Sequence, residues 1–341
     1  MSTFKRFLQY YKPYKGIFFM DLFCALILCI VDLSFPLILS YCTGQFFLNS
    51  SNEILKGVFV LGIGLLVMYV IRALCRYCVS CQGHVMGANM ESDMRQDLFN
   101  QYQRLSFSYY DKHNTGVMMS RVVSDLFDIC EFAHHGPENL FISLFKIVGS
   151  FIILATIYWP LALILLAVTV VMMVFSYSQN KKMRRTFMEN RKKIGSVNAS
   201  LQDSLGGIRV VQSFANEDIE IDKFNHSNME FLESKKDNYR VMGTFQGGNN
   251  FFQGLLYVTI IVFGGLFIAN GDLNPIVLAT FALYINVFVS PIEVLVEFTE
   301  MFQKGFSGFR RFEEVMNEVP EIQDSKNAKD LENVSGNIDF D

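Results

Sequence analysis

The sequence predicts an all-α membrane protein with six transmembrane helices and long helical extensions on the cytoplasmic side. Three observations predict this fold class. Six apolar stretches are each long enough to cross a bilayer, Lys and Arg are sorted between alternate connections, and two long connections keep a helical periodicity. Hydrophobic residues make up 51% of the chain and charged residues 18%, against about 25% charged residues in soluble domains. An ordinary soluble domain is therefore excluded.

Net charge and cysteine content exclude two further classes. A formal net charge of -4 argues against a nucleic-acid-binding protein, which carries a strongly basic surface. The seven cysteines are odd in number and irregularly spaced, which fits a reducing or membrane environment better than a secreted disulfide framework. The mean hydropathy of +0.27 is low for membrane spans alone, so a sizeable polar part must accompany them.

Each apolar stretch meets the length of about 20 residues that a helix needs to cross the bilayer core. The first begins too far into the chain, and is too long, to be a cleaved signal peptide. The third and fourth are joined only by Tyr158-Trp159-Pro160, and proline suits the first turn of the helix that follows. The predicted spans lie near residues 17–40, 54–80, 137–158, 160–179, 246–269 and 274–301.

The distribution of basic residues orients these spans. Of 29 Lys and Arg residues, 25 lie in segments 1–16, 83–133, 181–240 and 304–341, whereas the short connections carry none. Because Lys and Arg concentrate in cytoplasmic loops, both termini and both long connections are predicted to be cytoplasmic. The long connections are poor in proline and keep a period near 3.6, so they predict helical hairpins that project into the cytosol.

Polar residues recur at helical spacing inside the spans. In the sixth span they follow steps of three and four residues, which places them on one face. A charge at the bilayer centre costs about 2.5–3.5 kcal/mol, so such residues should face water or protein. We interpret these positions, and similar ones in the first and fifth spans, as a cavity open to the cytoplasm for a cationic or amphipathic solute. The predicted substrate-binding residues are Asp32, Asn250, Gln253, Asn286, Ser290, Glu293 and Glu297.

The charges within the spans also have a structural interpretation. In it, Arg72, Arg76 and Lys146 pair with Glu293 and Glu297 across helices or between subunits. Such pairs would neutralise the charges without any solute, so the two interpretations stay open.

Motifs for metal binding, catalysis and nucleotide binding are incomplete or missing in the sequence. The series Cys75-x-x-Cys78-x-x-Cys81 lacks the fourth ligand and the loop of an iron-sulfur site, and its helical context favours packing. The five histidines show no zinc-binding spacing, so no metal ligand is predicted. The Walker A motif is missing, so we predict no catalytic residue and no cofactor in this chain.

Four stretches carry the motifs of a known family. They are the opening residues 7–15, the first long connection with Phe107 to Asp111, Gly116, Ser120-Arg121 and Asp125, the second with residues 204–217, and the final residues 336–340. Together with the order of the spans, they resemble the transmembrane domain of an ABC exporter of the multidrug and lipid-flippase type. The resemblance covers essentially the whole chain. Its most specific part is 204–217, which is similar to the family pattern G-x-x-x-V-x-x-F-x-x-E.

The resemblance implies a domain organisation. It comprises an interfacial elbow helix over 1–16, a six-helix domain over 17–303, a linker over 304–335 and, at 336–341, the first strand of a nucleotide-binding domain. It further implies a domain-swapped homo- or heterodimer and two nucleotide-binding domains that hold ATP and Mg. The nucleotide motifs would follow residue 341. We therefore expect either a chain cut at a domain boundary, which the partial strand favours, or an ATPase on another chain.

Coupling helices at the tips of the two long connections are a further implication of the resemblance. They would lie at about 106–115 and 212–219 and would dock on the nucleotide-binding domains, the second on that of the partner subunit. The implied coupling residues are Tyr109, Tyr110, Asp111, Phe214, Ala215, Asn216 and Glu217.

The predicted function is the translocation of solute by an ATP-driven exporter in a bacterial plasma membrane. Cationic or amphipathic compounds or lipids would leave the cytoplasm by alternating access, and the chain itself is expected to contact membrane lipid, bind no nucleic acid and hydrolyse no ATP. Two alternatives remain. One is a nucleotide-independent channel or secondary transporter, and the other is a membrane-anchored assembly or receptor domain without a solute path.

Overall fold

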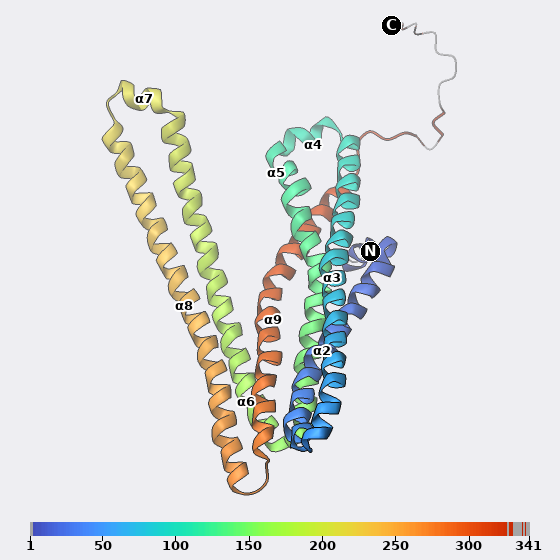
Figure 1. The fold of residues 1–341 in the computed structure, drawn as a ribbon. Coiled ribbons are helices and arrows are strands. Elements are labelled where there is room, and N and C mark those ends of the chain that lie inside the picture. Colours follow the sequence, from blue (N-terminus) through green and yellow to red (C-terminus); the bar gives the residue numbers. More distant parts are fainter. Residues whose placement is uncertain (1–2, 326, 330–335, 337, 339–341) are drawn as a thin grey trace. The chain divides into compact units, whose positions relative to one another are not determined.

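The computed structural model describes residues 3–325, 327–329, 336 and 338, and this part of the chain is helical without any strand (Figure 1). Five helical segments in it are long and apolar enough to cross a membrane. They are built on α2 (Lys15–Gly44), α3 (Ser51–Arg104), α6 (Leu126–Gly206), α8 (Glu217–Ala269) and α9 (Pro275–Met316). The predicted all-α membrane fold class is confirmed.

The third and fourth predicted spans both lie in α6. This helix is interrupted at Tyr158, whose backbone angles of φ -158° and ψ 95° are not helical. Figure 1 shows the chain reversing its direction within α6. Tyr158 opens the short connection that the sequence predicts between the two spans, so six predicted spans correspond to five helical segments.

The chain divides into two compact units. Unit 1 comprises Met1–Asp21, Ser80–Pro137 and Met301–Asp341, and unit 2 comprises Leu22–Val79 and Glu138–Glu300. Helices α2, α3, α6 and α9 each begin in one unit and end in the other.

The core of unit 2 lies among α2, α6, α8 and α9. Its largest buried side chains, Phe281, Tyr284 and Phe288, lie on one face of α9. The hydroxyl of Tyr284 donates a hydrogen bond of 2.5 Å to the carbonyl oxygen of Leu33 on α2. A tyrosine hydroxyl buried in this way needs such a partner. The face of α9 opposite to this core is therefore the one that remains accessible.

A smaller cluster in unit 2 contains the first two cysteines of the series. Cys75 and Cys78 on α3 pack with Cys24 and Leu28 of α2 and with Val79. All the cysteines of the chain are free thiols. Cys75 and Cys78 therefore contribute small apolar side chains to helix packing, as their helical context predicts.

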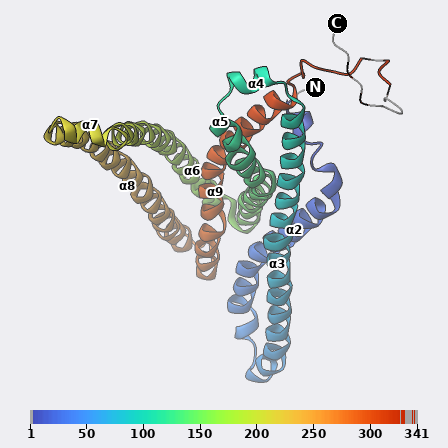
Figure 2. The ribbon, with the colours of Figure 1, turned by 90° about the horizontal axis from the view of Figure 1, so that it is seen from above.

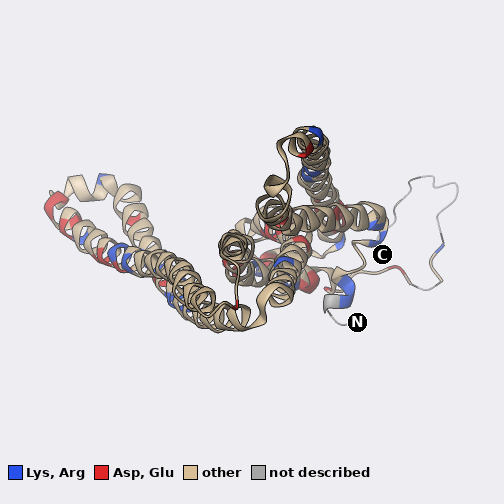
Figure 3. Ribbon diagram, turned by 60° about the horizontal axis from the view of Figure 1, so that its bottom comes forward, with Lys and Arg blue, Asp and Glu red and all other residues tan. Residues whose placement is uncertain are grey.

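The second limb of α6 and helix α8 form a long antiparallel hairpin within unit 2, closed by α7 (Ile208–Ser213) (Figures 1 and 2). Figure 3 shows charged residues along the part of this hairpin next to α7. Polar contacts between the two helices recur along its length, at Ser176–Asn249, Thr186–Asn238, Lys193–Glu230 and Ser204–Glu220. Lys193 is partly exposed and Glu230 is exposed, and their hydrogen bond lowers the pKa of Glu230 and raises that of Lys193.

The N-terminal segment of unit 1 is held against α3 and α6 by its aromatic side chains. It contains α1 (Thr3–Phe7) and a 3-10 turn at Lys12–Tyr14, rather than one continuous elbow helix over 1–16. The hydroxyl of Tyr10 donates to Asp97 at 2.8 Å, and that of Tyr11 donates to the carbonyl oxygen of Ala133 at 2.6 Å. Phe7 stacks on Phe132 with ring centroids 5.5 Å apart.

The last turns of α9 also belong to unit 1 and are fixed by a bidentate ion pair. Arg311 donates through Nε and Nη2 to the two carboxylate oxygens of Asp125, both at 2.7 Å. Asp125 ends the π-helical turn η3 (Arg121–Asp125) that precedes α6. Since α9 continues to Met316, the segment predicted as a linker begins as helix. The predicted strand at 336–341 falls outside the described residues except for Gly336 and Ile338, which lie in neither helix nor strand.

Candidate functional site

The accessible face of α9 carries four of the predicted substrate-binding residues. Asn286, Ser290, Glu293 and Glu297 are all exposed, at the steps of four, three and four residues that define one helical face. The opposite face is buried in the core of unit 2. Carboxylates in a membrane span are expected to face water or protein rather than hydrocarbon. This face is therefore a polar surface on an otherwise apolar helix.

Helix α8 extends this polar surface. The side-chain oxygen of Asn286 accepts hydrogen bonds from Nε2 of Gln253 at 3.2 Å and from the hydroxyl of Tyr257 at 3.3 Å. Asn250, one turn before Gln253, is exposed. The structure thus brings Gln253 and Asn286 together. It adds Tyr257, a residue of the same α8 face that the predicted site omitted. We call these exposed and paired residues of α8 and α9 the polar surface.

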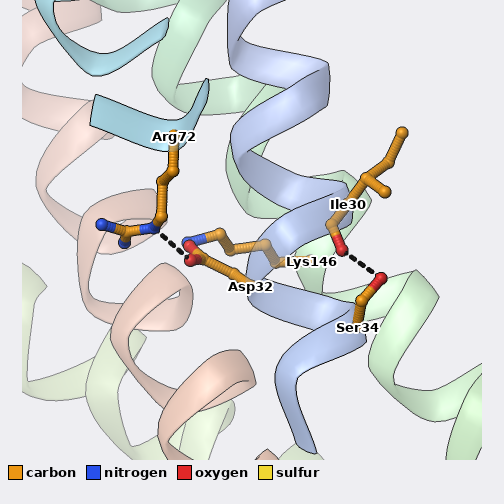
Figure 4. Close-up of polar contacts among 5 residues, drawn as sticks. All are labelled: Ile30, Asp32, Ser34, Arg72 and Lys146. Carbon is orange, nitrogen blue, oxygen red and sulfur yellow. Dashed lines mark hydrogen bonds and ion pairs between the residues drawn. The ribbon is translucent and has the colours of Figure 1, made fainter. Parts of the chain in front are cut away.

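Asp32 lies in a separate ion cluster on α2, shown in Figure 4. Its Oδ1 accepts a hydrogen bond from Nε of Arg72 at 3.0 Å, and its Oδ2 accepts one from Nζ of Lys146 at 2.5 Å. The nearby Ser34 hydroxyl instead donates to the carbonyl oxygen of Ile30 in its own helix. Two of the cations suspected of pairing with acids do so, but with Asp32 rather than with Glu293 or Glu297.

The Asp32 cluster carries one more positive than negative formal charge. The side chains of Asp32 and Lys146 are each 19% exposed, whereas that of Arg72 is 40% exposed. The carboxylate is therefore neutralised, and the excess positive charge is accessible on the side of Arg72. This distribution is opposite to that of the polar surface, where the accessible charges are carboxylates.

The tip of the first long connection is α4 (Phe107–Lys112), inside the predicted stretch 106–115. Tyr109 is buried and stacks on His113 with ring centroids 4.1 Å apart. Tyr110 donates from its hydroxyl to the carbonyl oxygen of Tyr102. Asp111 is exposed. The most accessible aromatic ring of the tip is Phe107, at 88% exposure. Phe107 belongs to the family motif, but its exposure is not predictable from the sequence, because side-chain burial in a six-residue helix has no periodic signal.

The tip of the second long connection begins earlier than predicted. Its short helix, α7, spans Ile208–Ser213, so the stretch 212–219 contains the end of α7, a turn and the start of α8. Phe214 is 72% exposed, and Ala215, Asn216 and Glu217 are exposed as well. The four implied coupling residues of this tip therefore lie together in the turn.

A Schellman motif ends α7. The amide of Asn216 donates to the carbonyl oxygen of Val211 at 3.0 Å, and that of Ala215 donates to the carbonyl oxygen of Gln212 at 3.3 Å. The first of these two donor residues along the chain takes a left-handed conformation in this motif, usually as glycine. Ala215 takes it here with φ 49°. Because a Cβ disfavours this region, the turn at the tip carries backbone strain.

Replacing Ala215 with glycine is expected to stabilise the turn by about 0.5–1 kcal/mol, since the strain of the left-handed alanine is removed at the cost of some chain entropy. Hydrogen exchange of the amides in 208–217 should slow, and Ala215→Val should accelerate it. Ala199→Gly is the control, at an exposed position inside α6, and it should instead destabilise its helix. Faster exchange in Ala215→Gly would contradict the left-handed assignment.

The family described as ABC transporter transmembrane region matches residues 18–292. An uncharacterized ABC transporter ATP-binding protein, YwjA of Bacillus subtilis strain 168, is 36% identical over 98% of the chain. The ATP-dependent lipid A-core flippase of Syntrophus aciditrophicus is 24% identical over 100% of it. A fatty acid ABC transporter ATP-binding/permease protein of Mycobacterium tuberculosis is 24% identical over 81%.

The chain spans 58%, 56% and 43% of the lengths of these three relatives. The family match covers most of the residues that form α2 to α9, including both long connections with the tips α4 and α7. The resemblance stated from the sequence motifs is confirmed. This all-α, multi-pass membrane chain belongs to the ABC transporter transmembrane region family.

Proposed function

We propose that this chain is the substrate-translocating domain of an ATP-driven exporter that moves amphipathic compounds out of the cytoplasm. The observation that carries the proposal is the polar surface of α8 and α9, which exposes Glu293 and Glu297 on a helix long and apolar enough to span a membrane. A surface of this kind is suited to a solute with a polar or cationic group. The family match favours this function over a nucleotide-independent channel or an assembly domain.

The energy for transport would come from two nucleotide-binding domains that hold ATP and Mg. In the proposed orientation both termini and both tips are cytoplasmic. The exposed Phe107 of α4 and Phe214 beyond α7 would enter pockets on these domains, with Asp111 and Glu217 at the rim, as buried aromatic anchors do at protein interfaces. Buried Tyr109 would support α4 from within.

The transporter would work as a homo- or heterodimer in which each α7 tip contacts the partner subunit's ATPase domain. Alternating access requires that the solute bind the inward-facing and outward-facing states with different affinities, since a ligand shifts an equilibrium only by that difference. In our proposal the polar surface provides the inward-facing affinity, and ATP-driven closure of the nucleotide-binding domains disrupts it.

Neutralising the two acids is expected to weaken stimulation of ATP hydrolysis by cationic amphiphiles. In the full transporter in lipid nanodiscs, Glu293→Gln/Glu297→Gln should raise the concentration for half-maximal stimulation about tenfold, which corresponds to about 1.4 kcal/mol. The control is Glu189→Gln/Glu233→Gln, on the exposed hairpin of α6 and α8. It makes the same change of charge and should leave the concentration for half-maximal stimulation unchanged. Equal shifts in both double variants would refute the role of the polar surface.

An anionic amphiphile is a second candidate substrate, because the Asp32 cluster exposes the positive Arg72. The names of two relatives, a lipid A-core flippase and a fatty acid transporter, agree with such a solute. Stimulation by anionic amphiphiles that is lost in Arg72→Gln and kept in Glu293→Gln/Glu297→Gln would favour this candidate.

A further inference from the structure

Three histidines that are distant in sequence lie together in unit 1. His84 is on α3, and His134 and His135 are on α6. Their ring centroids are 4.7 Å apart for His84–His134, 4.9 Å for His84–His135 and 4.1 Å for His134–His135. Each ring offers a nitrogen atom within 4.8 Å of those of the other two. We call this group the histidine cluster.

The hydrogen bonding of His134 leaves one ring nitrogen available. Its side chain is 3% exposed, and Nδ1 lies 2.7 Å from the carbonyl oxygen of Cys130. A carbonyl oxygen only accepts, so Nδ1 carries the proton and donates it. Nε2 then presents a lone pair, yet it is buried and has no hydrogen-bond partner among the described residues. Buried polar atoms almost always have a partner, so this nitrogen indicates a missing ligand.

The helix packing around the cluster brings α3 close to His134. Gly87 follows His84 by three residues and lies on the same face of α3. A Cβ at Gly87 would lie 2.7 Å from Nδ1 of His134 and 2.9 Å from Sγ of Cys130. Only glycine therefore permits this approach of α3 to α6. His84, at the exposed edge of the cluster, leaves it accessible from outside.

We propose that His84, His134 and His135 bind a divalent transition-metal ion, best matched by Zn²⁺, which ties α3 to α6. Imidazole nitrogen is a preferred ligand of zinc, and three histidines with an open fourth position are a known zinc arrangement. A carbonyl-bound Nδ1–H is also the usual way in which a ligating histidine is oriented. Glu131, whose Oε2 lies 3.9 Å from Nε2 of His135, or a water molecule would complete the site.

The nitrogen atoms need only a small adjustment to bind one ion. Zn–N distances of about 2.0–2.1 Å in tetrahedral geometry place ligand nitrogens about 3.3 Å apart. The side chains of His84 and His135 are both at least partly exposed. Their rotation can bring the ligand nitrogens to this spacing while buried His134 stays in place. The proposal does not depend on the proposed transport function.

Zinc binding to the full natural protein in nanodiscs, purified without a polyhistidine tag, tests this proposal. Titration against a chromophoric zinc chelator should give one Zn²⁺ per chain. His84→Ala, at an exposed position, should weaken zinc affinity at least about 100-fold, because it removes a direct ligand. Mutation of the outer-shell partners of a metal site already lowers metal affinity about 10–100-fold. Zinc should raise the thermal unfolding midpoint of the wild type but not that of His84→Ala.

His226→Ala is the matched control, because His226 lies on the exposed hairpin near Glu230 and outside the cluster. It should leave zinc affinity unchanged. His135→Ala provides a second ligand variant if His84→Ala alters folding, as judged by its unfolding midpoint without zinc. Co²⁺ bound to the wild type should show the absorption of a tetrahedral site. No saturable zinc binding, or equal losses in His226→Ala and His84→Ala, would overturn the proposal.

Discussion

Asp32→Ala is expected to destabilise the protein by about 2–3 kcal/mol, less than the about 3–5 kcal/mol lost when one partner of a fully buried ion pair is removed, because the side chains of Asp32 and Lys146 are each 19% exposed. Lys146 and Arg72 would both lose the carboxylate that they contact at 2.5 and 3.0 Å. The larger part of the loss should come from Lys146, whose side chain is 19% exposed. Arg72 is 40% exposed, so solvent compensates part of its loss. Titration with a denaturing detergent in mixed micelles measures the free energy of unfolding.

Removing the unpaired cation should restore much of this loss. Asp32→Ala/Lys146→Met takes away the ammonium group while keeping an unbranched side chain, so we expect it to be more stable than Asp32→Ala alone. Glu189→Ala, which removes an exposed carboxylate on the hairpin, is the control and should change stability by less than about 0.5 kcal/mol. A loss below about 1 kcal/mol in Asp32→Ala would show that the cluster is screened by water.

The spans were predictable from the sequence because crossing a bilayer requires only length and apolar composition. The break at Tyr158 was predictable as well, since proline and the lone tryptophan interrupt the apolar run there. The ion-pair partners of Asp32 were not predictable from the sequence. Arg72 and Lys146 are 40 and 114 residues away along the chain, and their meeting depends on how three helices are rotated about their axes. Helical spacing gives the face of a residue but not the neighbour of that face.

The tips and the histidine cluster illustrate two further limits. The resemblance implies a short helix at about 212–219, whereas α7 spans Ile208–Ser213. A glycine at position 215 would mark the end of α7, but the left-handed Ala215 gives no such signal in the sequence. Zinc motifs are recognised by close spacing on one segment. His84 and His134 are on different helices and meet only because Gly87 lets α3 approach α6.

Gly305→Ala, in unit 1, is expected to lower the free energy of unfolding by about 2–3 kcal/mol. A Cβ at Gly305 on α9 would overlap Cβ of Phe132 and would lie 2.8 Å from its Cγ and 3.0 Å from the carbonyl oxygen of Asp128. Cβ of Phe132 and the carbonyl oxygen of Asp128 are fixed by the backbone of α6, so no side-chain rotation moves these two atoms. The two helices must separate instead, which places the cost near the upper end of about 1–3 kcal/mol for overpacking. Phe302, stacked edge-on against Phe132 with centroids 5.4 Å apart, would move with α9.

Gly247→Ala is the matched control for Gly305→Ala. Both glycines lie inside long helices, so both substitutions gain the same helix propensity, about 1 kcal/mol. Nothing lies within 4 Å of a Cβ at Gly247, so Gly247→Ala should stabilise the protein, and the difference between the two variants isolates the approach of α9 to α6. Detergent unfolding of both variants measures this difference. If both are equally stable, α9 does not lie against Phe132 in solution. If only Gly305→Ala loses stability, the close packing of α9 on α6 is real and requires a residue without a side chain.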